Sequence, residues 1–364
     1  MSVRKSRRAA AFAAAGLAAV MGVCALCGCS NAAAEGKEVY TSYVAMETER
    51  YSSTAEVVKN VADSVVEIKT ESVTTQWGMQ YVVSGAGSGV IVAHDDGYDN
   101  YFIITNNHVV EGARDITVTL RSGDSYKASL VATDERGDIA VIKIAEEKTL
   151  NIARWGDSDA LLIGEDLIAI GNPLGNLGGT VTKGILSATE RSISVGNYTM
   201  TLLQTDTAIN PGNSGGGLFD MYGNLVGIVN AKTTDEEVEG ICFAIPANTA
   251  RSIYDDLVTD GVVKGRVTFG VDVATYRESI VYVTKVNDAA SGTFEQYDRV
   301  VSIGDKQITS LLSYNNALAT LKPDDEVQVT VYRGKVVNYG FTSTLEFSAQ
   351  PTTFTVKAKQ LSKR

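Results

Sequence analysis

Residues Thr207–Asp220 read TAINPGNSGGGLFD, a stretch in which Ser214 follows Pro-Gly-Asn and precedes three glycines. Glycine permits sharp turns and lets another chain approach the backbone closely. Backbone N–H groups can converge in such a turn, as a developing oxyanion requires during acyl transfer. The same composition is also typical of a plain hairpin loop. The stretch alone therefore leaves two interpretations of Ser214 open, a nucleophile and a turn residue.

Short apolar runs separated by turn residues fill the sequence from residue 61 to residue 246. They include VVSGAGSGVIVA, YFIITN, DITVTL, DIAVIKI, DLIAIG, MTLLQTD and NLVGIVNA. Evenly spaced short strands without helices between them indicate antiparallel barrels or a sandwich. We therefore expect a mainly β fold, and the length of this region suits two small barrels packed together.

Two further polar residues stand beside apolar strands in this region. His108 follows the run YFIITNN directly, whereas the second histidine of the chain, His94, lies in an acidic turn and is interpreted as a surface residue. Asp138 opens the apolar strand DIAVIKI, where a carboxylate is costly unless a neighbour hydrogen-bonds it. Acyl transfer needs a nucleophile, a base and a group that orients the base. Ser214, His108 and Asp138 are the candidates for these roles.

Six segments in register resemble the HtrA (Deg) type of serine protease, a trypsin-like double β-barrel followed by a PDZ domain. They are TNNHVV, GDIAVIKI, GNPLG, TVTKGILSA, TDTAINPGNSGGGL and GICFAIP. The resemblance implies a protease domain over residues 61–250 that needs no cofactor or metal. It implies that His108 is the general base, Asp138 its orienting carboxylate and Ser214 the nucleophile. Gly212, Asn213 and Ser214 would surround the oxyanion hole.

The resemblance also suggests a primary specificity pocket. Ala208, six residues before the nucleophile, would form its uncharged base, with Ile228 and Ile241 at its border. Such a pocket should accept small or medium apolar side chains and should not select Lys or Arg. The acidic loop Thr233–Gly240 is interpreted as a solvated loop, with attraction of basic substrate residues as the alternative.

The C-terminal part is predicted to hold a second, smaller α+β domain. A single helix is expected over Asn248–Val258, with Asn248 as its cap. Together with the turn that follows at Gly261–Gly265, it makes up the linker helix and turn assigned to 251–265. Residues 266–347 resemble a PDZ domain, whose carboxylate-binding turn would contain Phe269, Gly270 and Val271. A bound peptide would add a strand to its sheet.

The resemblance to PDZ domains is looser than that of the protease region. ASGTFEQY before Asp298 and the Asp324-Asp325 pair depart from the usual pattern. A domain that only packs or regulates is therefore kept as the alternative to a peptide-binding one. The last residues, 348–364, are expected to form a solvated basic tail.

The first 34 residues are interpreted as an export segment. Four basic residues within Met1–Arg8 precede a long uncharged apolar stretch, as in signal peptides. Leu26–Cys29 resembles a lipobox, which predicts lipidation of Cys29; a transmembrane anchor and simple release after Ala32–Ala34 are the alternatives. The mature protein is expected outside the cytoplasmic membrane, with a spacer at 35–60 in which a short helix starts near Ser53. Cys242 would be its one deeply placed cysteine, so no disulfide framework is available.

Charge and domain composition bound the function. The chain has 32 basic and 43 acidic residues, a net charge of -11. This charge opposes the large basic surface that binding to a phosphate backbone requires, so we exclude nucleic acid as a partner. Two functions remain: an exported endopeptidase that cleaves misfolded or exposed polypeptides, and a chaperone or peptide-tail binding protein with a silent triad. Expected partners are unfolded polypeptides, peptide C-termini and the membrane. The resemblance further suggests a homotrimer built through Tyr40, Tyr43 and Tyr51.

Overall fold

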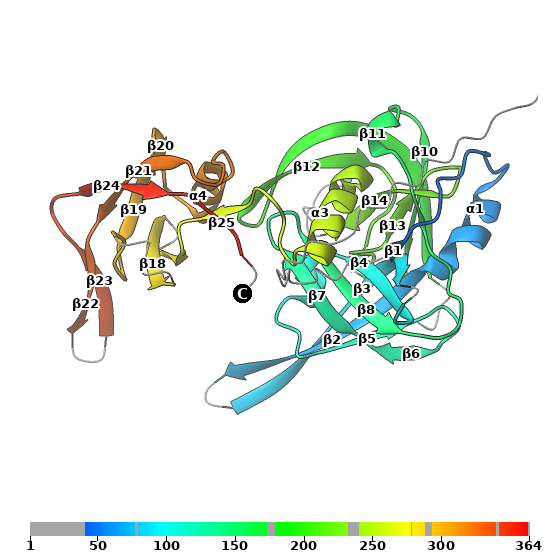
Figure 1. Ribbon diagram of the computed structural model, residues 1–364, viewed down its shortest axis with the longest axis horizontal. Coiled ribbons are helices and arrows are strands. Elements are labelled where there is room, and N and C mark those ends of the chain that lie inside the picture. The colour runs from blue at the N-terminus through cyan, green and yellow to red at the C-terminus, as the bar shows by residue number, and fades with distance from the viewer. Residues whose placement is uncertain are drawn as a thin grey trace, which may run out of the picture. The chain divides into compact units, whose positions relative to one another are not determined.

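The structure is a computed structural model that describes residues 41–76, 79–95, 97–172, 179–210, 212–231, 240–277, 279–287, 293–339 and 342–362. Strands dominate throughout (Figure 1). The predicted export segment, Cys29 and Tyr40 lie outside the described residues, as does nearly all of the acidic loop at 233–240. In the described part of the chain, no helix has both the length and the apolar character needed to cross a membrane.

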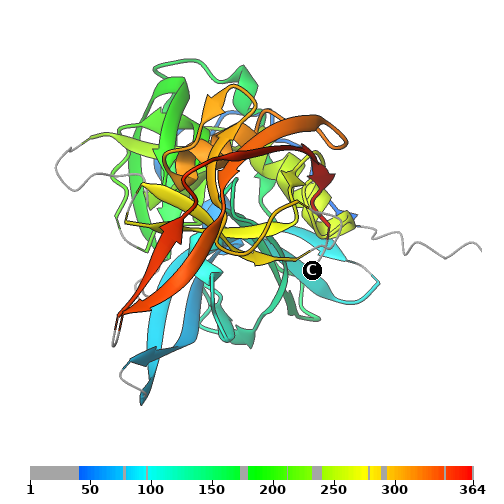
Figure 2. The same cartoon turned by 90° about the vertical axis from the view of Figure 1, so that its left-hand side faces the viewer.

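The first barrel is an antiparallel sheet with the order β6-β5-β2-β3-β4-β8-β7. Its strands are β2 Val65–Gln76, β3 Met79–Asp95, β4 Asn100–Thr105, β5 Asp115–Thr119, β6 Ser125–Lys127, β7 Ser129–Asp134 and β8 Ile139–Ala145. Only Ala128 separates β6, which pairs with β5, from β7, which pairs with β8. This bent segment closes the sheet. The β2–β3 hairpin extends beyond the closed part (Figure 1 and Figure 2).

The second barrel has the order β13-β10-β11-β12-β15-β14-β9 and closes because β13 pairs with both β10 and β14. Its strands are β9 Arg154–Trp155, β10 Asp166–Gly171, β11 Thr180–Val195, β12 Tyr198–Thr205, β13 Gly217–Phe219, β14 Asn224–Asn230 and β15 Cys242–Pro246. Several of these strands are buried on both faces.

Such strands are buried on both faces because successive side chains point to opposite sides of the sheet, and each side is covered by a different apolar cluster. Ile91 and Ile103 fill the first barrel, whereas Val90 and Ile104 belong to a cluster that joins the two sheets. Two helices, α1 (Thr54–Val61) and α3 (Ala247–Thr259), complete that shared cluster. The double-barrel region therefore has one core inside each barrel and one between them.

The segment that we expected to be a spacer, 35–60, is mostly exposed over residues 43–50 and packs against the barrels from Tyr51 onward. Helix α1 begins after Ser53, whose hydroxyl accepts the Glu56 N–H. Tyr43 donates to Asp255 at 2.7 Å, and Tyr51 packs against the shared cluster. The predicted helix start near Ser53 is thus confirmed. The part that the spacer prediction did not include is the packing: α1 is amphipathic and buries Val57 and Val61 in the shared cluster.

The predicted cap of α3 was also wrong. Pro246 occupies the N-cap position with extended backbone angles, and the helix begins at Ala247. The Asn248 side chain instead donates to Asp157 Oδ1 at 2.8 Å. A long-range partner thus replaces the local capping bond that the sequence suggested.

The C-terminal domain is a twisted sheet with the order β17-β18-β19-β21-β24, accompanied by one helix (Figure 1). Its elements are β16 Val267–Thr268, β17 Val271–Tyr276, β18 Ile280–Val286, β19 Arg299–Ile303, β20 Lys306–Gln307, α4 Leu311–Leu318, β21 Glu326–Tyr332, β22 Gly334–Tyr339, β23 Thr342–Phe347, β24 Thr352–Lys357 and β25 Lys359–Gln360. Strands β22 and β23 form a hairpin of their own.

The expected solvated tail at 348–364 is wrong for most of its length. Strand β24 pairs with β21 along six residues, and β25 pairs with β16. The alternation of Phe354, Val356 and Ala358 with polar residues is the signal of this strand, and Val356 and Ala358 are buried. The basic residues of the segment hid that alternation.

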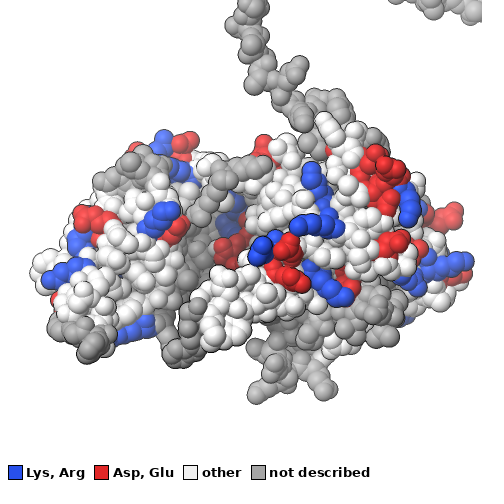
Figure 3. Space-filling view, turned by 90° about the horizontal axis from the view of Figure 1, so that it is seen from below, with Lys and Arg blue, Asp and Glu red and all other residues white. Residues whose placement is uncertain are grey.

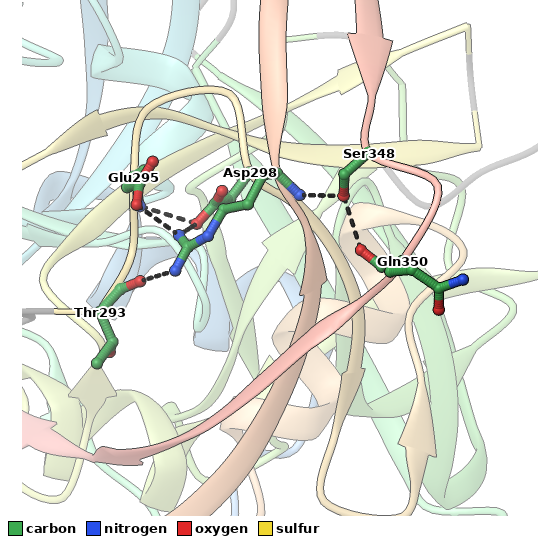
Figure 4. Close-up of polar contacts among 6 residues, drawn as sticks. Thr293, Glu295, Asp298, Ser348 and Gln350 are labelled. Carbon is green, nitrogen blue, oxygen red and sulfur yellow. Dashed lines mark hydrogen bonds and ion pairs between the residues drawn. The ribbon is translucent and has the colours of Figure 1, made fainter.

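An ion pair between the half-buried Arg333, which follows β21, and the buried Asp298 ties the sheet to the loop before β19 (Figure 4). The Arg333 guanidinium lies 2.6 Å from Asp298 Oδ2 and also donates to the Thr293 carbonyl. Asp298 is fully buried, and burial raises the pKa of its carboxyl above the ordinary value despite this partner. Arg333 thereby holds the loop against the sheet.

Surface charges lie in mixed groups. On the face seen in Figure 3, Lys and Arg side chains stand next to Asp and Glu side chains. Lys264, for example, pairs with both Asp256 and Asp260.

Candidate active site

His108 and Asp138 meet at the edge of the first barrel. His108 lies in α2 (Asn107–Val110), a single helical turn that follows β4. Asp138 Oδ2 is 2.7 Å from His108 Nδ1, and its Oδ1 accepts the His108 backbone N–H at 3.0 Å. One carboxylate thus fixes both the ring and the backbone of the histidine, and it directs Nε2 away from itself.

Asp138 is held in an unusual backbone conformation. Its φ is +50°, in the left-handed region that non-glycine residues seldom adopt. Its carbonyl accepts the Asn107 N–H at 3.2 Å and the Asn106 side-chain amide at 3.0 Å. These bonds join the turn before β8 to the helical turn that carries His108.

Asn230 is a site residue that the sequence analysis missed. Its side-chain amide donates to Asp138 Oδ2 at 2.9 Å, and it lies at the end of β14 in the second barrel. The available signal was a polar residue at the end of the apolar strand NLVGIVN. Its partner, however, is distant along the chain and could not be read from the sequence.

The turn around Ser214 presents two backbone donors. Asn213 donates its N–H to the Asn210 carbonyl at 3.0 Å, and Gly212 has a φ of +97°, as a tight turn with glycine requires. Among the described residues, neither the Gly212 N–H nor the Ser214 N–H has a protein acceptor. These two groups can therefore receive an oxyanion, whereas the N–H of Asn213 is already engaged.

Glycines 215 and 216 are required by close packing. A Cβ on Gly215 would meet the Ser88 carbonyl and the Thr105 hydroxyl at 2.2 Å, and Gly215 also has a φ of +82°. A Cβ on Gly216 would meet the Ile170 carbonyl at 2.4 Å. Gly215 donates to the Val229 carbonyl, which fixes the turn to β14 next to Asn230.

Short contacts connect the Ser214 turn to the His108 helix. Ser88 on β3 donates its N–H to the Ser214 carbonyl at 2.8 Å. A Cβ on Gly87 would lie 2.7 Å from the Val109 side chain and 3.2 Å from the Ser214 carbonyl, so Gly87 fills the narrow space between them. Within the described chain no hydrogen bond joins the Ser214 hydroxyl to the His108 ring.

Comparison with known proteins identifies both domains. Residues 87–228 match the trypsin-like peptidase domain family, and residues 267–339 match the PDZ domain family. The chain is 34% identical over 325 residues to the serine protease Do-like HtrA of Bacillus subtilis. The aligned region covers 79% of this chain and 72% of that protein. The chain belongs to the HtrA family of serine proteases. The predicted fold and the serine endopeptidase class are thereby confirmed.

Other HtrA relatives agree. The periplasmic serine endoprotease DegP of Escherichia coli is 38% identical over 279 residues, which are 72% of this chain and 57% of that protein. The solved structure of the HtrA-type protease AlgW with decapeptide has a TM-score of 0.55 at 30% identity and covers 86% of this chain and 100% of that one. The serine endoprotease from Yersinia pestis has a TM-score of 0.52, with 30% identity, and covers 86% and 100% of the two chains.

The three residues that we assigned to the HtrA specificity pocket do not share one environment. Ala208 is exposed, and its carbonyl accepts the Thr182 hydroxyl at 2.9 Å. Ile241 is 38% exposed, whereas Ile228 is fully buried in the cluster between the barrels. Ile228 faces that cluster because side chains alternate along β14, so we exclude it from the pocket.

The expected carboxylate-binding turn precedes β17. Phe269 is fully buried, Gly270 has a φ of +72°, and Val271 begins the strand. The Gly270 N–H donates to the Thr268 hydroxyl at 3.0 Å. Strand β17 stands at the end of its sheet and pairs with β18 alone among the described strands. Its other edge has the backbone groups that an added peptide strand needs.

Proposed function

We propose that this protein is an exported endopeptidase that cleaves misfolded or exposed polypeptides through an acyl-enzyme on Ser214. The observation that carries the proposal is the pair of hydrogen bonds by which Asp138 holds His108. Nearby, the turn around Ser214 offers the N–H groups of Gly212 and Ser214, which have no acceptor among the described residues. An orienting carboxylate, a base and an oxyanion site are the components that serine-dependent acyl transfer requires.

In the proposed mechanism, the Ser214 hydroxyl oxygen bonds to the scissile carbonyl carbon while His108 Nε2 takes its proton. The carbonyl oxygen becomes an oxyanion that receives the Gly212 and Ser214 N–H groups. The C–N bond then breaks, and His108 returns the proton to the leaving amine. Water repeats the sequence on the acyl-enzyme, which releases the acid product and restores Ser214.

Asp138 stays ionised in this scheme and stabilises the imidazolium that forms on His108. The Ser214–His108 hydrogen bond, absent within the described chain, is expected to form when a substrate closes the site, since such bonds often tighten only in the complex. The same absence is the observation that favours the alternative, a binding protein whose triad is silent.

A fluorophosphonate probe tests the proposal directly. We expect covalent labelling of Ser214 in the full chain and its loss in Ser214→Ala. Labelling should be repeated with added peptides, because the enzyme would then also be labelled if its site closes only when a peptide binds. A wild-type protein that stays unlabelled under all these conditions, yet binds unfolded casein, would establish the silent-triad alternative.

The proposed substrate preference is for small or medium apolar side chains at the cleaved position. Ala208 places no charge at the proposed base of the pocket, and Ile241 offers an exposed apolar wall. We expect fluorogenic peptides with Ala or Val at this position to be cleaved at least about tenfold faster than those with Lys. Faster cleavage after Lys would contradict the pocket assignment.

We further propose that β17 and the turn Phe269–Val271 bind peptide C-termini. The free edge of β17 and the match to the PDZ domain family support this role. The AlgW structure named above contains a decapeptide. Fluorescence polarisation should detect a free-carboxylate peptide and give weaker binding for its C-terminal amide; equal binding would leave the domain a packing or regulatory role.

Location and assembly complete the proposal. Export by the N-terminal segment and lipidation of Cys29 would place the enzyme outside the cytoplasmic membrane, where relatives named periplasmic proteases act. Mass spectrometry of the mature N-terminus distinguishes a lipidated Cys29 from an anchor or a released chain. The proposed homotrimer is tested by light scattering; Tyr43, one of its candidate contacts, is 38% exposed on the protease domain.

A further inference from the structure

We propose that Ser88 is a positioning residue of the oxyanion site, whose hydroxyl holds the Gly212 turn in the conformation that directs its N–H toward a substrate. This inference rests on the proposed roles of Gly212 and Ser214. Ser88 does not touch the substrate in this proposal and acts through the turn alone.

Ser88 contacts both residues whose N–H groups form the oxyanion site. Its hydroxyl donates to the Gly212 carbonyl at 2.7 Å, and its backbone N–H donates to the Ser214 carbonyl at 2.8 Å. The Gly212 carbonyl shares a rigid peptide plane with the Asn213 N–H, which is itself bonded to the Asn210 carbonyl. With this plane held at both its carbonyl and its N–H, only φ and ψ of Gly212 separate it from the plane of the Gly212 N–H, so the hold limits the directions that this N–H can take. Ser88 therefore fixes both ends of the three-residue segment at once.

The Ser88 hydroxyl is buried and both donates and accepts a hydrogen bond. Besides donating to Gly212, its oxygen accepts the Asn172 N–H at 2.8 Å, and the residue is 0% exposed. Ser88 lies on β3, opposite Glu67 of β2, and its carbonyl accepts the Thr105 hydroxyl of β4 at 2.7 Å. The turn is thus anchored to the interior of the first barrel, and water cannot replace the anchor.

Removal of the Ser88 hydroxyl would break two hydrogen bonds and loosen the Gly212 turn. The Gly212 carbonyl and the Asn172 N–H would both lose a partner inside the protein. Gly212 has a wide choice of backbone angles because it lacks Cβ, so a freed carbonyl can rotate. The Gly212 N–H would then point into the oxyanion site in only a fraction of the molecules.

Ser64 provides a matched control for the loss of a buried hydroxyl. It is 1% exposed, and its hydroxyl donates to the Val61 carbonyl at 2.6 Å within its own turn. Ser64→Ala removes the same group at a similar depth without touching the Ser214 turn. Both variants should lose thermal stability, with the larger loss in Ser88→Ala, which leaves two groups without a partner where Ser64→Ala leaves one. Only Ser88→Ala should also lose kcat and boronate binding, which a purely structural role of the hydroxyl would not change.

The experiment compares wild type, Ser88→Ala, Ser88→Cys and Ser64→Ala in the full chain. Each is assayed for kcat, KM and inhibition by a peptide boronic acid, whose tetrahedral adduct places an oxygen in the oxyanion site. Wild-type labelling at Ser214 by the fluorophosphonate probe is established first. Failure of that labelling would count against the proposed function and would be recognised before any Ser88 variant is judged.

We expect Ser88→Ala to lower kcat about 10- to 100-fold and to weaken boronate inhibition by a similar factor, with KM within about threefold, because only binding of the oxyanion is impaired. Ser88→Cys, which keeps a weak donor, should recover part of both. The inference is overturned if Ser88→Ala and Ser64→Ala have the same kcat, or if boronate inhibition is unchanged.

Discussion

The Asp138 carboxylate contacts His108 twice, through the ring Nδ1 at 2.7 Å and through the backbone N–H at 3.0 Å. It therefore sets the position of the imidazole as well as its tautomer. The third bond of this carboxylate comes from Asn230 in the second barrel, so the orientation of the base depends on both barrels.

Asp138→Asn should lower kcat by roughly 10⁴-fold with little change in fold, because an amide would present the wrong hydrogen-bonding group to Nδ1 and favour the wrong tautomer. The measurement is kcat on a fluorogenic peptide, with circular dichroism as the check on folding. A folded variant that retains more than a tenth of wild-type kcat would remove Asp138 from the mechanism.

Gly215→Ala should destabilise the chain by roughly 3 kcal/mol, since left-handed strain adds to a collision with Ser88 and Thr105. Gly123 is the matched control: it has a φ of +94°, and a Cβ added there would meet no atom within 4 Å. Gly123→Ala should cost only about 1 kcal/mol, the strain alone. Chemical denaturation measures both, and equal losses would disprove the packing argument.

Arg333→Met should destabilise the C-terminal domain by about 3 kcal/mol near neutral pH, because it leaves the buried Asp298 carboxylate without its cation. The pKa of Asp298 is already raised by burial and should rise further in the variant. The cost of the charge is present above that pKa and is relieved as the pH falls through it toward the ordinary value. The deficit relative to wild type should therefore shrink on acidification.

Denaturant unfolding of the full chain between pH 7 and pH 4, followed by a probe in the C-terminal domain, measures this effect. A deficit that stays constant or grows as the pH falls would show that Asp298 is not the group left unpaired.

Glu67→Met should stabilise the protein by about 1 kcal/mol. Glu67 is fully buried on β2, and within the described chain neither of its carboxylate oxygens has a partner in hydrogen-bonding geometry. Its ion-pair partner Lys69, whose Nζ lies 3.2 Å from Oε2, is largely exposed. Replacing a poorly compensated buried charge by an apolar side chain of similar size is often stabilising. Glu71→Met, at an exposed position of the same strand, should change the free energy of unfolding by less than about 0.5 kcal/mol.

A loss of stability in Glu67→Met larger than that in Glu71→Met would mean that the carboxylate has a compensating partner.

Local sequence patterns predicted most of the fold. Strand periodicity and turn residues located the barrels, and the strand contexts of His108, Asp138 and Ser214 marked these residues as the candidates for the triad. The patterns failed where a distant partner decides the conformation. Asn248 bonds to Asp157 and does not cap its helix, and the 348–364 segment contains a strand whose partner lies far upstream.

The site residues that the sequence did not reveal share this property. Ser88 and Asn230 act on residues more than ninety positions away, through bonds that exist only after the barrels have assembled. Ile228 was misplaced for a different reason. Its strand is buried on both faces, so composition alone could not tell which face each residue occupies.

Strand β25 pairs with β16, so the residues that enter the C-terminal domain lie beside those that leave it. Leu361 donates its N–H to the Arg266 carbonyl at 2.7 Å, which fastens the two ends together. Because its two ends are adjacent, we expect that this domain can be removed from the chain or exchanged between related proteases as one unit. For the same reason, a circular permutant with new termini in a distant loop should keep the sheet intact.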